Sequence, residues 1–163
     1  AILELTGPEG IRQVPIQEFY TGPGKTVRRH EEVMTAIRIR RRDYEGYTGC
    51  YIKYGKRNAM EIATLGCACL VKLSWDKKVV EDMRIAYGVA APTPVRCPET
   101  EKSVSGQAVS KALLLQTGKG VLNEVNPRTS WRASKEFRLQ LVEELAKRAM
   151  AQAIRNGGGE VDA

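Results

Sequence analysis

Residues 64–73 of the chain read Thr-Leu-Gly-Cys-Ala-Cys-Leu-Val-Lys-Leu, and this stretch decides the expected fold. A run so dense in small apolar residues is typical of a strand that is buried on both faces or that lies under helices. Residues 74–77 have turn chemistry, and residues 80–89 run back as a second strand. Residues 50–54 precede the run as a further strand, so we expect an antiparallel sheet.

Two helices are expected after this sheet. Residues 108–125 carry apolar side chains at helical spacing. The last helix is the clearest element, and Ser130 or Ser134 caps its start in this interpretation. Its apolar stripe recurs at every fourth residue: Phe137, Leu141, Leu145 and Ala149. The expected fold class is therefore α+β, with an antiparallel three- to four-stranded sheet packed by two C-terminal helices.

A strand-rich segment precedes this unit. Residues 1–5 and 11–16 predict a hairpin, and residues 33–39 predict a third strand. One side of that third strand is apolar and consists of Val33, Thr35, Ile37 and Ile39. The polar, turn-rich residues that follow indicate a boundary. We therefore expect three parts: residues 1–44, an α+β domain at residues 45–157, and a flexible tail at residues 158–163.

The composition narrows the class of protein. Of the 163 residues, 42% are hydrophobic and 28% are charged, which is the balance of a soluble globular domain. No apolar run approaches the ~20 residues of a membrane span, and no secretory signal is visible. The chain opens directly in a strand pattern, as expected for a piece of a longer fold.

The cysteines predict neither disulfides nor a metal centre. There are four of them: Cys50, Cys67, Cys69 and Cys97. Cys67 and Cys69 would share one face of a strand, and two thiols do not complete a site that needs about four ligands. We expect small buried thiols in a reducing compartment, which favours the cytoplasm.

The net charge of +7 leaves several partners open, among them nucleic acid, acidic membrane, a phosphorylated cofactor and an acidic subunit. The basic residues cluster at 38–42 and 53–57. Aromatic residues make up only 6% of the chain, so a platform for stacking bases is poorly supplied. A solvated strand end that faces a protein partner is the favoured interpretation of residues 38–42, and no nucleic-acid or membrane partner is predicted.

One motif imitates a phosphate-binding loop. Residues 22–26 read Gly-Pro-Gly-Lys-Thr, but the P-loop pattern requires a further glycine where this chain has Phe19. The residues after Thr26 also lack the apolar face of a helix. His30, the only histidine, stands in a charged turn with no nucleophile close in sequence. Neither feature predicts catalysis, and we assign no catalytic residue.

Lys53 is unusual because it stands mid-strand between Tyr51 and Tyr54 in a largely apolar segment. A lysine in this position either extends its ammonium to water or points it at an anion or a polar acceptor. The spacing alone leaves both interpretations open.

Ordered segments at residues 19–26, 31–34, 51–63, 85–96 and 127–138 together resemble a known family, the FAD-binding subunits of xanthine dehydrogenase-type molybdenum hydroxylases. The family includes carbon monoxide dehydrogenase and nicotinate dehydrogenase. The resemblance covers nearly the whole chain, and its closing part looks like the carbon monoxide dehydrogenase flavoprotein C-terminal domain.

The resemblance implies an electron-transfer role within a multi-subunit oxidoreductase. In this family, molybdopterin and 2Fe–2S clusters lie on partner subunits, and electrons pass through FAD to NAD or another acceptor. The cofactor carries the redox chemistry while the protein positions it. The implied partners are a molybdopterin-binding subunit, an iron–sulfur subunit and the remaining N-terminal part of the FAD subunit.

The resemblance also implies four cofactor-binding residues. Lys53 matches a lysine that approaches the polar edge of the flavin ring, where a cation stabilises negative charge. Met34 matches an apolar residue that packs near the ring. Pro23 and Gly24 match the loop beside the flavin where NAD docks. The family's glycine-rich pyrophosphate loops lie N-terminal to the residues present here, so a non-catalytic docking module without independent cofactor binding is the alternative expectation.

Overall fold

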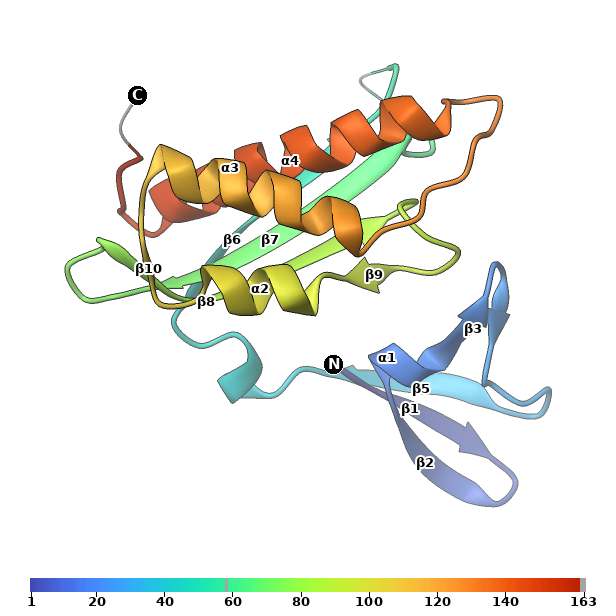
Figure 1. The fold of residues 1–163 in the computed structure, drawn as a ribbon. Coiled ribbons are helices and arrows are strands. Elements are labelled where there is room, and N and C mark those ends of the chain that lie inside the picture. Colours follow the sequence, from blue (N-terminus) through green and yellow to red (C-terminus); the bar gives the residue numbers. More distant parts are fainter. Residues whose placement is uncertain (58, 162–163) are drawn as a thin grey trace. The chain divides into compact units, whose positions relative to one another are not determined.

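The computed structural model describes residues 1–57 and 59–161. They form two compact units, Ala1–Glu45 and Gly46–Ala163, which we call the N-terminal unit and the sheet–helix unit (Figure 1). The assignment of residues 1–44 to the end of an FAD-binding domain and of residues 45–157 to a closing domain stays a prediction. Residues 162 and 163 of the expected tail lie outside the described residues, while Val161 packs partly against the core.

The sheet–helix unit is built on three long antiparallel strands: β6 (Tyr47–Tyr54), β7 (Leu65–Leu73) and β8 (Val79–Gly88). Two short strands, β9 (Val95–Arg96) and β10 (Gln107–Ala108), both pair with β8. The order is β10-β8-β7-β6, with β9 also beside β8. The predicted α+β class with an antiparallel sheet is confirmed, and the two short strands extend the three that the sequence indicated.

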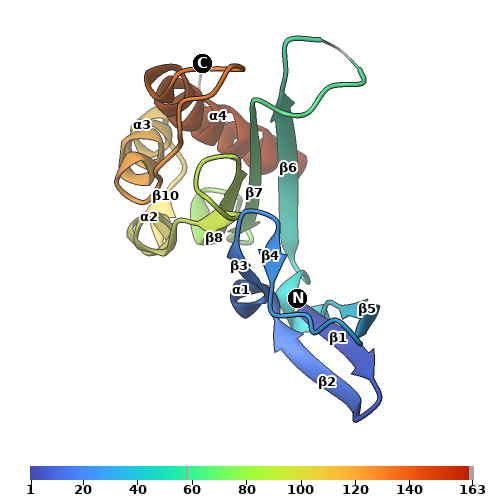
Figure 2. The ribbon, with the colours of Figure 1, turned by 90° about the vertical axis from the view of Figure 1, so that its right-hand side faces the viewer.

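The helices of this unit lie on one face of the sheet (Figures 1 and 2). They are α2 (Pro98–Val104), α3 (Lys111–Gly120), a 3-10 turn (Val121–Asn123) and α4 (Lys135–Asn156). The helix expected at residues 108–125 was too long, because Ala108 belongs to β10 and the hydroxyl of Ser110 caps α3. The sequence did not predict α2, whose first residue is Pro98. Proline lacks a backbone N–H, but an N–H at the first position of a helix would have no partner within the helix, so proline is tolerated there.

The core of the sheet–helix unit lies between β7, β8 and α4. The inward residues of β7 are fully buried: Leu65, Cys67, Cys69 and Val71. The strand therefore lies under helices, one of the two arrangements that its composition allowed. In α4, the expected stripe holds at Leu141, Leu145 and Ala149, whereas Phe137 is 39% exposed and meets Tyr54 edge to face. Ser134 is the cap, since its side chain accepts from the Phe137 N–H. No helix among the described residues combines the length and apolar character that membrane crossing requires.

The N-terminal unit is a three-stranded antiparallel sheet with a hairpin. Its strands β1 (Ile2–Gly7), β2 (Gly10–Pro15) and β5 (Val33–Arg38) have the order β2-β1-β5. Between β2 and β5 come α1 (Ile16–Phe19) and the paired strands β3 (Tyr20–Gly22) and β4 (Lys25–Thr26); a 3-10 turn (Arg41–Asp43) ends the unit.

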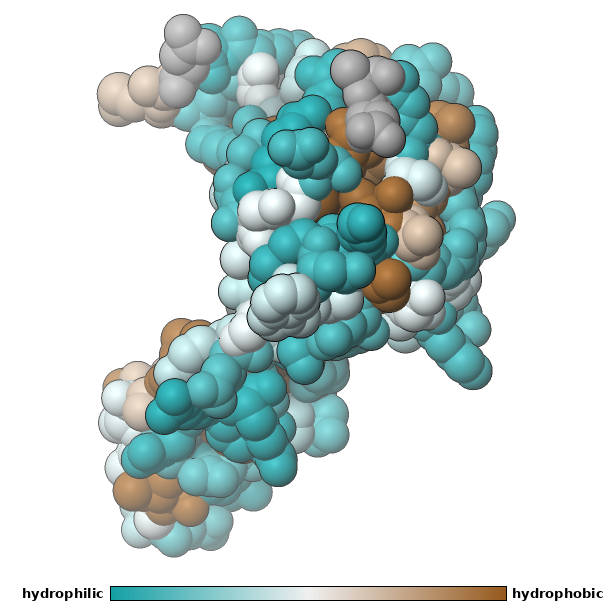
Figure 3. Space-filling view, turned by 90° about the vertical axis from the view of Figure 1, so that its left-hand side faces the viewer, coloured by the Kyte–Doolittle hydropathy of each residue, from teal (hydrophilic) through white to brown (hydrophobic). Residues whose placement is uncertain are grey.

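The core of the N-terminal unit is small and contains Leu3, Leu5, Val14 and Phe19. The apolar side expected for the third strand is not buried, because Val33 and Ile37 are 65% and 60% exposed. The predicted recurrence of apolar residues is present in β5, but no other described part of the chain covers these side chains. Hydrophobic residues are visible at the surface in the space-filling view (Figure 3).

Candidate functional site

The face of the large sheet that the helices leave open carries a row of small residues. Side chains alternate along a strand, so the neighbours of the buried Cys67 and Tyr87 point to the open face. The small residues are Gly66 and Ala68 of β7 and Ala86 and Gly88 of β8, paired directly across the strands. We call these four residues the small-residue face. Gly66 is buried, whereas Ala68, Ala86 and Gly88 are half-buried, so only part of this face is open to a further group.

Tyr51 and Lys53 of β6 flank the small-residue face. In the register of the sheet, Tyr51 pairs with Ala68 and Lys53 pairs with Gly66. Tyr51 is 65% exposed, and its hydroxyl lies over Gly66, where an added Cβ would stand only 2.8 Å from the phenolic oxygen. The absence of a side chain at position 66 therefore lets the Tyr51 ring lie along the sheet.

The loop after β6 fixes the ammonium group of Lys53. Lys53 Nζ donates to the carbonyl oxygen of Glu61 over 2.5 Å, and the Glu61 carboxylate accepts from the Arg57 N–H at 2.8 Å. An ammonium has three donors, so two N–H bonds of Lys53 remain for a further acceptor. The exposed side chain thus presents a positioned positive charge at the edge of the small-residue face.

The other three residues predicted to bind a cofactor belong to the N-terminal unit. Pro23 and Gly24 form the exposed turn between β3 and β4, and Gly24 has φ +68°, which glycine adopts without strain. Met34 stands on β5 opposite Leu5 and is 39% exposed. They come from different elements, and their role at a cofactor stays a prediction, as does that of Lys53.

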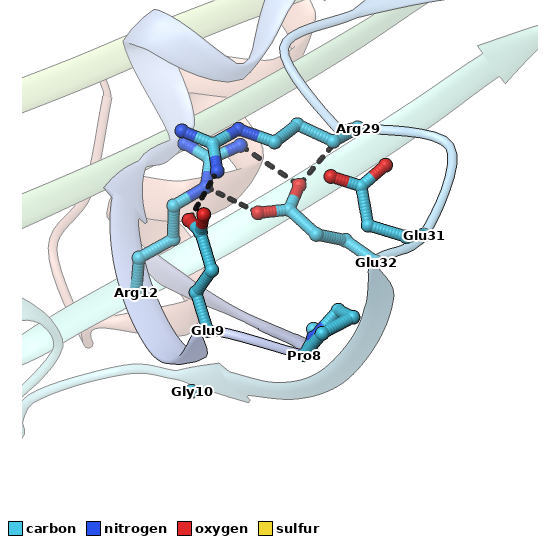
Figure 4. A pocket seen from close by; sticks show the side chains of 8 residues that line it. Pro8, Glu9, Gly10, Arg12, Arg29, Glu31 and Glu32 are labelled. Atoms are coloured by element: carbon cyan, nitrogen blue, oxygen red, sulfur yellow. Dashed lines mark hydrogen bonds and ion pairs between the residues drawn. The ribbon is translucent and has the colours of Figure 1, made fainter.

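A buried carboxylate in the N-terminal unit was missed by the sequence reasoning. Glu32 is 5% exposed and lines a cavity of about 40 Å³ with Arg12, Arg29 and Glu31 among its neighbours (Figure 4). Arg12 donates two hydrogen bonds to the Glu32 carboxylate, from Nε to Oε1 at 2.5 Å and from Nη2 to Oε2 at 2.9 Å. The Arg29 N–H adds a third at 2.6 Å.

These bonds make Glu32 a structural anchor. The hydrogen bond from Arg12 outweighs the effect of burial and lowers the pKa of Glu32 from 4.5 to about 2. A carboxylate held ionised in this way does not serve as a proton acceptor near neutral pH. Its partner Arg12 lies twenty residues earlier, so no local pattern could have indicated the pair. Glu32 instead ties the loop before β5 to β2, which positions the start of the strand that carries Met34.

The structure removes two other candidates. The Gly-Pro-Gly-Lys-Thr segment lies in the β3–β4 hairpin, whereas a phosphate-binding loop joins a strand to a helix. The basic run at residues 38–42 is largely neutralised, because Arg38, Arg40 and Arg41 form ion pairs with Glu4, Asp43 and Glu45.

The cysteines are free thiols in the described structure. Burial raises the pKa of Cys67 and of Cys97 to about 12. These thiols therefore stay protonated at neutral pH, which fits a packing role.

The fold is that of chains from molybdenum-containing dehydrogenases. A crystal structure of the Cu,Mo-CO dehydrogenase in its cyanide-inactivated form superposes with a TM-score of 0.84 at 29% identity, covering 95% of this chain and 53% of that chain. The reconstituted CO dehydrogenase from Oligotropha carboxidovorans also gives 0.84, at 25% identity and the same coverage. Residues 50–153 match the family model described as CO dehydrogenase flavoprotein C-terminal domain, and the chain belongs to that family.

Curated relatives extend the similarity to the N-terminal unit. The xanthine dehydrogenase FAD-binding subunit of Escherichia coli O157:H7 is 40% identical over 161 residues, which is 99% of this chain and 54% of the relative. The glyceraldehyde dehydrogenase medium chain of Sulfolobus acidocaldarius is 30% identical over 93% of this chain and 52% of the relative. The chain thus spans about half the length of the curated relatives it matches. The family predicted from the sequence is confirmed.

Proposed function

We propose that the chain is part of the FAD-binding subunit of a xanthine dehydrogenase-type molybdenum hydroxylase and that it supplies one wall of the flavin site. The observation that carries this proposal is the small-residue face with the positioned ammonium of Lys53 beside it. Support comes from the relative in Escherichia coli O157:H7, which is described as an FAD-binding subunit.

The residues present fit a flavin. A planar ring with carbonyl oxygens at its edge suits the part of the small-residue face where Ala68, Ala86 and Gly88 stay half-buried, with the aromatic ring of Tyr51 beside it. The two free N–H bonds of Lys53 suit such oxygens. FAD, when bound, supplies the electron transfer. The chain contributes a fixed positive charge from Lys53, an apolar contact from Met34, and the exposed turn of Pro23 and Gly24, which is assigned to acceptor docking.

The wider assembly follows from the same proposal. Molybdopterin and 2Fe–2S clusters belong to partner subunits, and electrons leave through FAD to NAD or another acceptor. The CO dehydrogenase relatives are described as medium chains, which agrees with a multi-subunit oxidoreductase. The free cysteines agree with a cytoplasmic setting.

A purely structural docking module of the same subunit is the second candidate. The exposed apolar side chains Val33, Ile37 and Ile39 favour it, because exposed apolar residues gathered along β5 and just past its end form the kind of patch that marks an interaction surface. Flavin absorbance after gel filtration separates the two candidates. The purified chain is mixed with FAD, alone and with the other half of the subunit. Retention of flavin only by the combined halves supports a shared site, and no retention in either case supports the docking module.

Replacing Lys53 tests the assignment directly. Lys53→Met in the flavin-loaded subunit is expected to lower the flavin reduction potential, since the positive charge that favours the reduced form is lost. Lys56→Met is the matched control, because Lys56 is an exposed lysine in the adjacent loop. A potential that is unchanged in Lys53→Met, or that shifts equally in both variants, would contradict the role of Lys53.

A further inference from the structure

Arg138 is a buried cation at the start of α4. The side chain is 2% exposed and turns back toward the preceding loop. Its Nη1 donates to the carbonyl oxygen of Arg128, and Nη2 donates to Ser130 Oγ at 2.8 Å. Its Nε is buried and has no hydrogen-bond partner among the described residues. We call residues 126–138 the arginine loop; they comprise the loop and the first four residues of α4.

No carboxylate of residues 1–57 or 59–161 forms an ion pair that compensates this charge. Among the described residues, none lies within ion-pair distance of Arg138, and none pairs with Arg128 or Arg132. Burial lowers the pKa of Arg138, and the charges of Arg128 and Arg132 lower it further. Buried charges in proteins are normally paired, so a buried guanidinium without a carboxylate among the described residues raises the question of an external counter-ion.

The surroundings strengthen the positive field. The arginine loop contains four cations, Arg128, Arg132, Lys135 and Arg138, against one carboxylate, Glu136. Glu136 is already engaged, because it bonds to the side chain of Ser134 and to backbone N–H at the helix start. The 22-residue helix α4 also begins here, and the positive end of its dipole favours an anion.

An exposed tryptophan stands among these cations. Trp131 is 82% exposed, and the guanidinium of Arg132 lies 4.3 Å from the centre of its ring. Tryptophan and arginine are the residues most enriched at the energetic centres of protein interfaces. The loop leads into α4 at one end of the sheet–helix unit (Figure 1), where Phe137 meets Tyr54. A free oxyanion would leave the indole in water, whereas a protein surface would cover it.

We propose that the arginine loop docks an acidic segment of a partner protein, with an Asp or Glu carboxylate held by Arg128 and Arg132. That carboxylate compensates Arg138, and the segment covers Trp131. The expectation that partner subunits exist rests on the proposed function, but the chemistry of the loop does not require a flavin. The occupant is defined by charge complementarity: carboxylate for the guanidiniums, beside apolar contact for the indole.

Trp131 itself reports on the site. The chain has two tryptophans, and Trp75, 95% exposed in the turn after β7, is removed by Trp75→Phe. The probe is a short oligo-L-glutamate peptide, titrated while the fluorescence of Trp131 is recorded. A saturable change is expected, and inorganic phosphate at equal ionic strength should produce much less. The Arg128→Gln variant should weaken peptide binding about tenfold, because one of the two guanidiniums proposed to hold the carboxylate is lost.

Arg155→Gln is the matched control. Arg155 is an exposed arginine in the last turn of α4, so the substitution changes the net charge equally at the opposite end of the helix. Its peptide affinity should stay within about twofold of the parent. Equal weakening in both variants would show general charge attraction, and an equal response to phosphate would show a free oxyanion site. Either outcome, or no fluorescence response, overturns the proposal. No flavin is present in this titration, so its failure is distinguishable from failure of the flavin-retention experiment.

Discussion

The interiors of the two units are stabilised by different kinds of interaction. Among the described residues, the core cluster of the sheet–helix unit contains twenty-one buried apolar residues, whereas that of the N-terminal unit contains four. The smaller unit also encloses two carboxylates, Glu4 at 8% and Glu32 at 5% exposure, each bound by an arginine. In the described part of the chain, the much larger core of the other unit has one such carboxylate, Glu101, which Arg96 binds. A small unit buries a smaller fraction of its surface than a large one, so apolar packing stabilises it less. Hydrogen bonds and ion pairs then supply a larger share of its stability. The comparison predicts that substitutions of core residues mainly destabilise the sheet–helix unit. Substitutions of charged residues should mainly destabilise the N-terminal unit.

The largest effect should follow from a cavity in the larger unit. Leu145 is 3% exposed on the inner side of α4, and Leu145→Ala is expected to lower the free energy of unfolding by about 2 to 5 kcal/mol. Leu115→Ala on α3 is the control, since Leu115 is 55% exposed. Urea unfolding followed by helical circular dichroism measures both, because the long helices belong to this unit. Equal losses in the two variants would show that packing on α4 is not what stabilises it.

A charge substitution should loosen the N-terminal unit alone. Glu32→Gln removes the carboxylate that binds Arg12 and the Arg29 N–H, so hydrogen exchange at the Arg29 amide should accelerate, roughly tenfold or more. Glu31→Gln is the control, because Glu31 lines the same cavity but is exposed. The helical unfolding transition of the larger unit should not move in either variant. Unchanged exchange in Glu32→Gln would contradict the anchoring role of this residue.

The difference between local spacing and contacts across elements also explains which features could be predicted from the sequence. Local periodicity predicted the long strands and α4, because their apolar residues recur at spacings that depend on the element alone. It placed the residues of the small-residue face on strands, but only the register brings Gly66 and Gly88 beside Lys53. The grip of Arg12 on Glu32 and the uncompensated charge of Arg138 depend on contacts between separate elements. No spacing in the sequence indicates such contacts, and the exposure of Val33 and Ile37 was missed for the same reason.

The smallest and most specific effect concerns pH. The pKa of Glu32 is lowered from 4.5 to about 2 in the folded chain, first of all by its hydrogen bond with Arg12. Well above pH 4.5 the carboxylate is ionised in both folded and unfolded chains, so its stabilising contribution is complete. As the pH falls, the unfolded chain takes up the proton first, and the contribution is lost progressively between about pH 4.5 and pH 2.

The difference between parent and Glu32→Gln isolates this term, because the pKa of Glu4 is also lowered by its bond with Arg38 and titrates in both proteins. Exchange at residues 27–33 should therefore differ most between the two proteins near neutral pH, and the difference should shrink toward pH 2. A difference that persists unchanged at pH 2 would mean that the shape of the side chain, rather than its charge, holds the loop. In that case the smaller unit would be stabilised by packing after all, as the larger one is.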